Sequence, residues 1–380
     1  MEKLNNFINI MNNHIDIADK TYIKRINKDK NGKITNKLFF KDVLYASLQN
    51  LNETSLATVA NDLKIHCKND ISKNSIIKKR NLESTSTHIC NLNESLITEI
   101  YKPSNNFISP NNFKIDCNKK SFIRNNNDNI DMSLYVNRSN KRFVAIDGDQ
   151  INTNKKLVNK RTIKLSKNGL YGTGLINNMF DVLNKIPINY DLIESSKKDF
   201  SKKKFNERKG LLDHIDKLNN NDIVIVDKGY YSHDVMNELD NNNIGYIFRM
   251  KDNCKLFKNM GFGKSKSIEH NGTCVQLFKY KIMKNVYCIM PSITEHIYIA
   301  EIKSLYWLRW NVETDIRKRK YDIVTDNKLR SLTYNSFMTD FESVRFIAII
   351  SSFIEYTGLK STPTNKKINS KIVYRFFTNV

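Results

Sequence analysis

Residues 207–251, ERKGLLDHIDKLNNNDIVIVDKGYYSHDVMNELDNNNIGYIFRMK, contain the pattern that decides the fold class. The segment opens with leucine and isoleucine at helical spacing and breaks at three consecutive asparagines. The apolar run DIVIVD at 222–227 follows. After a glycine turn, a second helix is expected to begin at Ser232 or His233 and to lead into the run GYIFRMK at 245–251. Helix, strand, helix and strand in this order predict an α/β unit with parallel strands.

The flanking segments extend this unit in both directions. KRFVAIDGDQI at 141–151 and RTIKLSK at 161–167 are predicted strands, because each is a short run rich in β-branched residues. LINNMFDVLNKI at 175–186 is predicted to be a helix. Alternating apolar and polar residues within 252–297 predict added β structure. One long helix is expected from about 295 to 320, followed by two more helices.

The N-terminal part of the chain predicts a helical unit. Leu44, Leu48 and Leu51 recur at helical spacing, and Asn52–Ser55 supply a helix stop followed by a new N-cap. A small DNA-binding module and a plain helical cap are both compatible with this pattern. The predicted organisation is a helical DNA-binding domain at 1–100, an Asn-rich linker at 101–140, the first part of an α/β core at 141–251, a β-rich insertion at 252–297, a helix completing the core at 298–325, and C-terminal helices at 326–380.

The charge of the chain indicates a polyanionic partner. There are 62 Lys and Arg against 39 Asp and Glu, a net charge of +23, which favours nucleic acid first and an anionic membrane second. Abundant Asn, Lys and Ile are also what an AT-rich coding sequence produces, so lysine alone is weak support. The clustering of Arg309, Arg317 and Arg319 within eleven residues means more.

The six cysteines are widely spread and form no metal-finger pattern, so they are interpreted as reduced thiols. The N-terminal residues lack the apolar core of a signal peptide, and the most apolar stretch, RFIAIISSFIEY at 345–356, is too short to span a bilayer. We therefore expect a soluble intracellular protein without a membrane partner.

Two acids follow apolar runs that are predicted strands. Asp147 ends FVAID and Asp227 ends DIVIVD, which places both at strand ends, where open α/β sheets carry their reactive groups. An aspartate in this position is also a common turn former or helix N-cap. Two such acids together favour a functional role.

A third acid lies on the long predicted helix. On an uninterrupted helix, at about 100° per residue, one narrow stripe carries Tyr306, Arg309, Glu313, Arg317 and Lys320, and an apolar seam lies beside it. The alternative is a solvated stripe, in which Arg309 and Arg317 form helical pairs with Glu313.

Three carboxylates from two strand ends and one helix, in a strongly basic chain, are typical of a site for phosphoryl transfer on nucleic acid. Oxygen ligands favour hard cations, and no group of soft ligands competes. The sequence therefore predicts two Mg²⁺ ions held by Asp147, Asp227 and Glu313, with Mn²⁺ able to substitute.

These residues resemble the DDE transposases of the insertion-sequence-four type. The family signature Y-x2-R-x3-E-x6-K is matched by Tyr306, Arg309, Glu313 and Lys320. The blocks IDG at 146–148 and DKGY at 227–230 also match in order and separation. The resemblance covers roughly 140 to 355.

The resemblance implies a fold and an activity. The fold would be α/β, a ribonuclease-H-like core with a β-rich insertion before the catalytic helix, preceded by a small all-α domain. The activity would be cleavage of double-stranded DNA at transposon-end inverted repeats and joining of those ends to target DNA, by a protein that dimerises when it binds two ends. Tyr306, Arg309 and Lys320 would hold the DNA end near its terminal phosphates, and Arg317 on the same stripe is a further candidate contact.

Two features depart from the family pattern. Asp149 stands where the family often has a hydroxyl residue. We assign the metal ligand to Asp147, because it directly follows the apolar run, matches the family block IDG and precedes a glycine that is expected to end the strand, and we expect Asp149 to support the ligands or to form a turn. Both tryptophans lie in the signature helix, which leaves Phe257, Phe262, Phe278 or Tyr280 to stack on an unpaired base.

Other functions are also compatible with these residues. One is a transposase-derived DNA-binding protein without cleavage, and another is a different two-metal nuclease. In each case we expect the protein in the compartment that holds its DNA, either cytoplasm or nucleus according to the host.

Overall fold

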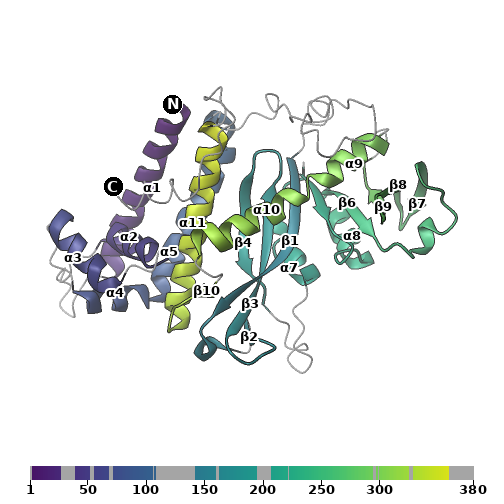
Figure 1. Cartoon of the computed structure of the whole chain (residues 1–380). Helices are drawn as coiled ribbons and strands as arrows, with labels where there is room; N and C mark the ends of the chain where they lie inside the picture. Colours follow the sequence, from purple (N-terminus) through teal and green to yellow (C-terminus); the bar gives the residue numbers. More distant parts are fainter. Residues whose placement is uncertain are drawn as a thin grey trace. The chain divides into compact units, whose positions relative to one another are not determined.

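The computed structural model describes residues 2–26, 39–51, 55–67, 72–105, 107, 142–159, 162–194, 207–220, 222–293, 297, 299–324 and 328–358 (Figure 1). The chain divides into two compact units, and each is described by itself. Unit 1 comprises Met1–Ile108, Gln150–Gly174 and Asp315–Val380, and unit 2 comprises Ser109–Asp149 and Leu175–Thr314. The sequence predicts continuous segments, whereas each of these units is assembled from separated stretches of the chain.

Parallel strands form the centre of unit 2. Strand β1 (Arg142–Thr153) pairs in parallel with β5 (Asp222–Val226), and β5 pairs in parallel with β6 (Gly245–Met250). All five residues of β5 are buried, which explains the apolar run that follows Asp222. The predicted α/β unit with parallel strands is confirmed.

Helices connect these strands as the sequence predicts. Helix α7 (Glu207–Asp213) is followed by a short 3₁₀ turn and by β5, and helix α8 (His233–Asn241) connects β5 to β6. The Ser232 side chain caps α8 by accepting a hydrogen bond from the Val235 amide.

The segment 175–186, predicted to be a helix, is instead part of an antiparallel hairpin. Strand β3 (Gly172–Asp181) turns at 182–185 into β4 (Ile186–Leu192). Every residue of β3 is buried. Its asparagine side chains donate hydrogen bonds to backbone carbonyls in the interior, whereas in the predicted helix they would have faced solvent. The Asp181 side chain accepts hydrogen bonds from the Leu183 and Asn184 amides and so fixes the turn.

The β structure expected within 252–297 is present as an antiparallel meander. It consists of β7 (Lys264–His270), β8 (Thr273–Ile282) and β9 (Asn285–Pro291), and β9 pairs with β6. The strands of unit 2 follow the order β4-β3-β1-β5-β6-β9-β8-β7. One mixed sheet therefore joins the parallel strands to the meander.

The long helix expected from about 295 to 320 is broken. Helix α9 (Ile299–Trp307) ends at a turn, and α10 (Trp310–Lys318) begins three residues later. The Arg309 amide donates to the Tyr306 carbonyl at 3.2 Å, which is the tighter spacing of a 3₁₀ turn. A π-helical turn, Arg319–Ile323, follows α10. The single uninterrupted stripe assumed from the sequence is therefore wrong. The sequence does not predict either change of geometry, because the segment contains no glycine or proline.

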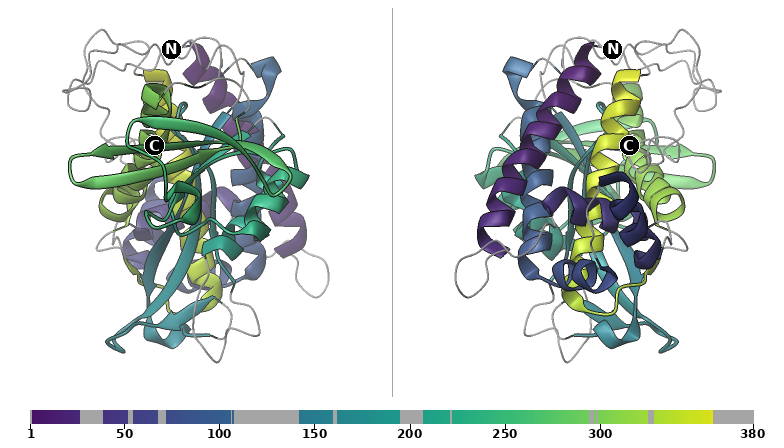
Figure 2. Two further views of the ribbon diagram at one scale, coloured as in Figure 1. Left: turned by 90° about the vertical axis from the view of Figure 1, so that its right-hand side faces the viewer. Right: turned by 90° about the vertical axis from the view of Figure 1, so that its left-hand side faces the viewer.

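Helices from both ends of the chain form the core of unit 1. The long C-terminal helix α11 packs against α1, α2, α4 and α5 (Figure 2). The bounds of the unit 1 helices are α1 (Glu2–Ile26), α2 (Phe40–Leu51), α3 (Leu56–Cys67), α4 (Lys73–Arg80), α5 (Glu83–Tyr101) and α11 (Tyr334–Gly358). Phe7 of α1 stacks on Phe353 of α11 with ring centroids 4.0 Å apart.

The two helices expected to close the chain are represented in the described part by α11 alone, and residues 359–380 lie outside the described residues. The short strands β2 (Ile163–Leu165) and β10 (Lys328–Leu329) complete unit 1 by pairing with β3 and β1. Most of the predicted linker at 101–140 also lies outside the described residues.

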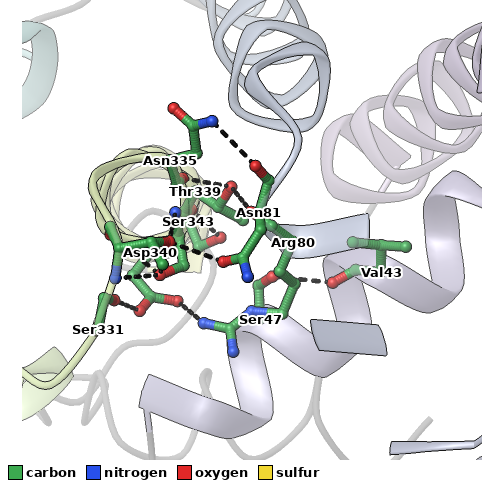
Figure 3. A network of polar contacts seen from close by, with 11 residues as sticks. Val43, Ser47, Arg80, Asn81, Ser331, Asn335, Thr339, Asp340 and Ser343 are labelled. Carbon is green, nitrogen blue, oxygen red and sulfur yellow. Dashed lines mark hydrogen bonds and ion pairs between the residues drawn. The ribbon is translucent and has the colours of Figure 1, made fainter. Parts of the chain in front are cut away.

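A buried polar network joins α4 to α11 (Figure 3). Arg80, at the end of α4, forms an ion pair with Asp340 of α11, and both side chains are almost fully buried. The Thr339 hydroxyl donates to the Arg80 carbonyl at 2.9 Å, so α11 also caps the C-terminal end of α4. Arg80, the last residue of α4, thus lies in the interior of unit 1.

Cys90, Cys254, Cys274 and Cys288 are free thiols, as expected for these positions. Within the described ranges, no helix has both the length and the apolar character needed to cross a membrane.

Candidate active site

Asp147 and Asp227 leave two neighbouring parallel strands at the same level. The pairing of β1 with β5 ends at Ile146 and Val226, and the next residue of each strand is one of the two acids. The backbone carbonyl of Asp147 accepts a hydrogen bond from the buried Asn178 side chain of β3 at 3.2 Å. The sheet therefore brings together the two acids that the sequence places after apolar runs.

Strand β1 does not end at Gly148, contrary to the sequence-based expectation. It continues through Asp149 to Thr153. A Cβ atom at Gly148 would lie 2.5 Å from Oε1 of Glu207, so the Glu207 side chain occupies the space that a larger residue would need here. Side chains alternate along a strand, so Asp147 and Asp149 point to the same face of β1. The expected strand end at Gly148 therefore gives no reason to prefer Asp147, and that preference rests on its position after the apolar run and on its match to the IDG block.

Two residues from different elements hold the Asp227 carboxylate. Arg249 of β6 forms an ion pair with Oδ1 of Asp227 at 3.4 Å, and the Tyr306 hydroxyl of α9 donates to the same atom at 3.3 Å. The Arg249 guanidinium also lies over the Tyr287 ring of β9, 4.5 Å from its centroid. The β6–β9 pairing and α9 thus fix the position of Asp227.

Arg309 links the other two acids. Its guanidinium contacts Oδ2 of Asp147 at 3.3 Å and Oε1 of Glu313 at 2.5 Å. Arg309 is only 5% exposed, so it does not lie on a solvated stripe, but the helical pair with Glu313 that this alternative predicts is present. The turn between α9 and α10 therefore places a buried cation between two carboxylates from separate parts of the chain.

Burial is the largest influence on the electrostatics of Asp147. Burial raises the pKa of this carboxyl group to about 6, the Arg309 guanidinium opposes that rise, and the negative charges of Glu313 and Glu207 add to it. A carboxyl group in this setting binds a proton or another cation more readily than an exposed one.

Tyr306 and Arg309 thus lie with Asp147, Asp227 and Glu313 in unit 2. The other two predicted DNA contacts belong to unit 1. Arg317 is exposed near the end of α10, and Lys320 is half-buried in the π-helical turn.

The sequence-based search missed Glu207, Tyr230 and Arg249. Glu207 approaches the site from the first residue of α7, and Arg249 lies within a strand that was predicted correctly. Tyr230 belongs to the DKGY block, but its sequence position does not reveal that it is buried beside the acids.

The donor atoms fit a hard divalent ion, because they are carboxylate oxygens beside a glycine backbone that leaves them room. Within the described ranges, no group of three His, Cys, Asp or Glu side chains is already assembled around a position for a metal ion, so an ion bound here would have to draw the acids together. In this arrangement Arg309 and Arg249 are the cations that neutralise the acids.

Comparison with protein families identifies the class of protein. The family described as the transposase DDE domain matches residues 138–350, more than half of the chain. The chain belongs to this family and is a DNA transposase. Transposases of this family generally use divalent metal ions.

The other comparisons are less informative. No curated protein matches the chain. Among solved structures, a cryo-EM structure of a piggyBac transposase synaptic complex with hairpin DNA has a TM-score of 0.46 and 12% sequence identity. That likeness covers 97% of this chain and 77% of the other.

Of the four aromatic residues considered for base stacking, Phe262 is 57% exposed, whereas Phe257, Phe278 and Tyr280 are buried.

Proposed function

We propose that this transposase is of the insertion-sequence-four type and that Asp147, Asp227 and Glu313 hold two Mg²⁺ ions in a ribonuclease-H-like core. One observation carries the assignment of the acids. The ends of the paired parts of β1 and β5 supply Asp147 and Asp227, and Arg309 links Asp147 directly to Glu313. The strand order β4-β3-β1-β5-β6, with an antiparallel hairpin beside parallel strands, supports the choice of core.

Different residues at this site orient the acids and neutralise their charge. Arg249 and Tyr306 orient Asp227, and Arg309 orients Asp147 and Glu313. Divalent ions held by these acids would supply the positive charge that activates an attacking oxygen and stabilises the transferring phosphoryl group. The partly buried surroundings of Asp147 strengthen its electrostatic interactions with any such cation.

The substrate in this proposal is double-stranded DNA, first the inverted repeats at the transposon ends and then the target. Arg317 and Lys320 would contact backbone phosphates, and Tyr306 and Arg309 would lie beside the DNA end while they position the acids. The helical segment 1–100 would read the end sequence, and two transposon ends would be held by a dimer. The protein would act in whichever compartment holds the host DNA.

Single substitutions at the acids test the assignment. We expect Asp227→Asn and Glu313→Gln to abolish Mg²⁺-dependent strand cleavage while DNA binding stays near the wild-type level, because each variant keeps the size of the side chain and removes its charge. Asp213→Asn, which changes an exposed carboxylate at the far end of α7, serves as the matched control and should cleave normally.

The substrate for this assay is a DNA duplex that carries the inverted repeats found on either side of the gene. Cleavage at the wild-type rate by either variant would show that the acids are assigned wrongly. Preferential cleavage of branched DNA over transposon-end DNA would instead favour another two-metal nuclease.

A further inference from the structure

The side chain of Glu207 lies between the two strand ends that carry Asp147 and Asp227. Its Oε1 atom would be 2.5 Å from a Cβ placed on Gly148, the residue after Asp147. Its Oε2 atom would be 3.8 Å from a Cβ placed on Gly229, two residues after Asp227. The carboxylate of Glu207 is thus accommodated by the glycines of the IDG and DKGY blocks.

Several contacts fix the helix that presents Glu207. The Arg208 side chain donates to the Gly229 carbonyl at 2.8 Å, and the Asn177 side chain donates to the Gly210 carbonyl at 3.0 Å. A Cβ at Gly210 would lie 2.4 Å from the Ile193 side chain, so α7 packs closely on this part of unit 2. Glu207 is therefore presented by a helix tied to the sheet and to the turn after β5.

The charge environment distinguishes Glu207 from the other three acids. Arg309 pairs with Asp147 and Glu313, and Arg249 pairs with Asp227. Within the ranges that the structure describes, Glu207 has no hydrogen bond or ion pair, and the charges near it are the negative charges of Asp227 and Asp147. A partly buried carboxylate facing another carboxylate is unfavourable unless a cation lies close to both.

A second feature of the site points independently to a bound ligand. The Tyr230 side chain is 1% exposed, and its hydroxyl has no hydrogen-bond partner among the described residues. Burial, and after it the negative charges of Glu207, Asp147 and Asp227, raise the pKa of the Tyr230 hydroxyl, so this group is within electrostatic reach of the acids. A buried hydroxyl without a partner is unfavourable, and an oxygen atom bound at this site would satisfy it.

We propose that Glu207 is a fourth carboxylate of the metal site and that it binds a divalent ion together with Asp147 and Asp227. This inference rests on the proposed function, because it assumes that those two acids bind metal. It adds a ligand from α7 to the three acids expected from the family. The closeness of Glu207 to Gly148, the glycine contact at Gly229 and the buried Tyr230 hydroxyl together support it.

Binding of Mn²⁺ to the full-length protein, measured by electron paramagnetic resonance, tests the proposal without relying on activity. Glu207→Gln keeps the shape of the side chain and removes its charge, and we expect it to weaken the binding of one Mn²⁺ ion by about tenfold or more. Glu207→Asp should retain part of the affinity. Asp213→Asn, on the same helix, should bind Mn²⁺ as the wild type does.

A backbone variant provides a second test. Gly148→Ala introduces a Cβ at 2.5 Å from Glu207 and should displace that side chain, so it should weaken Mn²⁺ binding as Glu207→Gln does. Gly261→Ala is the matched control, because its Cβ would have ordinary contact with a lysine side chain at 3.7 Å. Circular dichroism of each variant identifies any loss of folding, and the remaining folded variants then decide the outcome.

The outcomes distinguish the role of Glu207 from the proposed metal site of Asp147, Asp227 and Glu313. If Asp227→Asn loses Mn²⁺ while folded Glu207→Gln and Gly148→Ala bind it like the wild type, the role of Glu207 is wrong and the proposed function stands. If neither Asp227→Asn nor Glu313→Gln changes Mn²⁺ binding, the proposed metal site itself is wrong. Weakening by Glu207→Gln and Asp227→Asn, with normal binding by Asp213→Asn, supports both.

Discussion

Arg309 and Asp147 illustrate how single residues set the properties of this site. The Arg309 guanidinium is buried and contacts carboxylates from β1 and α10, so a residue expected to hold phosphate already has two anionic partners within unit 2. Asp147 nevertheless keeps a raised pKa, because burial and the neighbouring acids outweigh the attraction of that one cation. The negative charge of Asp147 is therefore only partly compensated, which favours the binding of a further cation at this site.

The raised pKa of Asp147 predicts a pH-dependent stability in EDTA. Its folded-state pKa of about 6 exceeds the ordinary value of 3.8, so the folded protein binds the proton more tightly than the unfolded chain does. The stabilisation is therefore complete below about pH 4 and is lost as the pH rises through about 6, by an amount on the order of 3 kcal/mol.

Asp147→Asn removes this titration and should lack the corresponding loss of stability. Urea unfolding followed by the fluorescence of Trp307 and Trp310 in EDTA, from about pH 4.5 to about pH 7.5, measures the difference. Parallel stability curves for the wild type and Asp147→Asn would contradict the prediction.

At the scale of elements, the hairpin of β3 and β4 occupies a segment whose sequence also suits a helix. Its turn contains Lys185 at a φ of 58°, a left-handed conformation that L-residues rarely adopt. Asp181 and Asn184 stabilise that turn through their side chains. The hairpin matters for the site because Asn178 of β3 donates to the Asp147 carbonyl and Asn177 donates to the Gly210 carbonyl in the middle of α7.

Glycine and alanine at position 185 distinguish the hairpin from a helix. Lys185→Gly should unfold with a free energy up to about 1 kcal/mol higher than Lys185→Ala, because glycine adopts the left-handed conformation without strain. In a helix the order would reverse, since glycine costs about 1 kcal/mol relative to alanine. Comparing the two variants with each other cancels the loss of the lysine side chain, and chemical denaturation gives the difference.

At the scale of the whole chain, segments far apart in sequence build each unit. Helix α11 buries apolar residues against N-terminal helices, and Arg345 of α11 lies 2.5 Å from Glu94 of α5. Removing residues 1–137 would expose that surface. Point substitutions are therefore a better test of end recognition by the N-terminal helices than truncation.

Two basic residues of α4 should separate structural from DNA-binding roles. Arg80→Ala should destabilise unit 1 by about 3–5 kcal/mol, because it leaves the Asp340 carboxylate buried without its cation. Lys78→Ala changes an exposed side chain and should leave stability within about 0.5 kcal/mol of the wild type. If α4 contacts DNA, Lys78→Ala should also reduce the salt dependence of binding by roughly one unit of slope.

Thermal unfolding and filter binding over a salt series measure these effects. Equal stability of the two variants would show that the Arg80–Asp340 pair does not hold α4 to α11. An unchanged salt slope for Lys78→Ala would remove α4 from the proposed DNA interface.

The sequence by itself determined the α/β unit at 207–251, the helical character of 40–101 and the acids that follow apolar runs, because these depend on local periodicity and on residues adjacent in the chain. Only the tertiary structure decided that 175–186 is a hairpin, that the signature helix breaks at Leu308–Arg309, and that β1 continues through Gly148. Each of these depends on contacts between distant segments, such as Arg309 with Asp147, or Glu207 beside Gly148. Local patterns do not contain those contacts, so only the folded chain reveals which residues surround the acids.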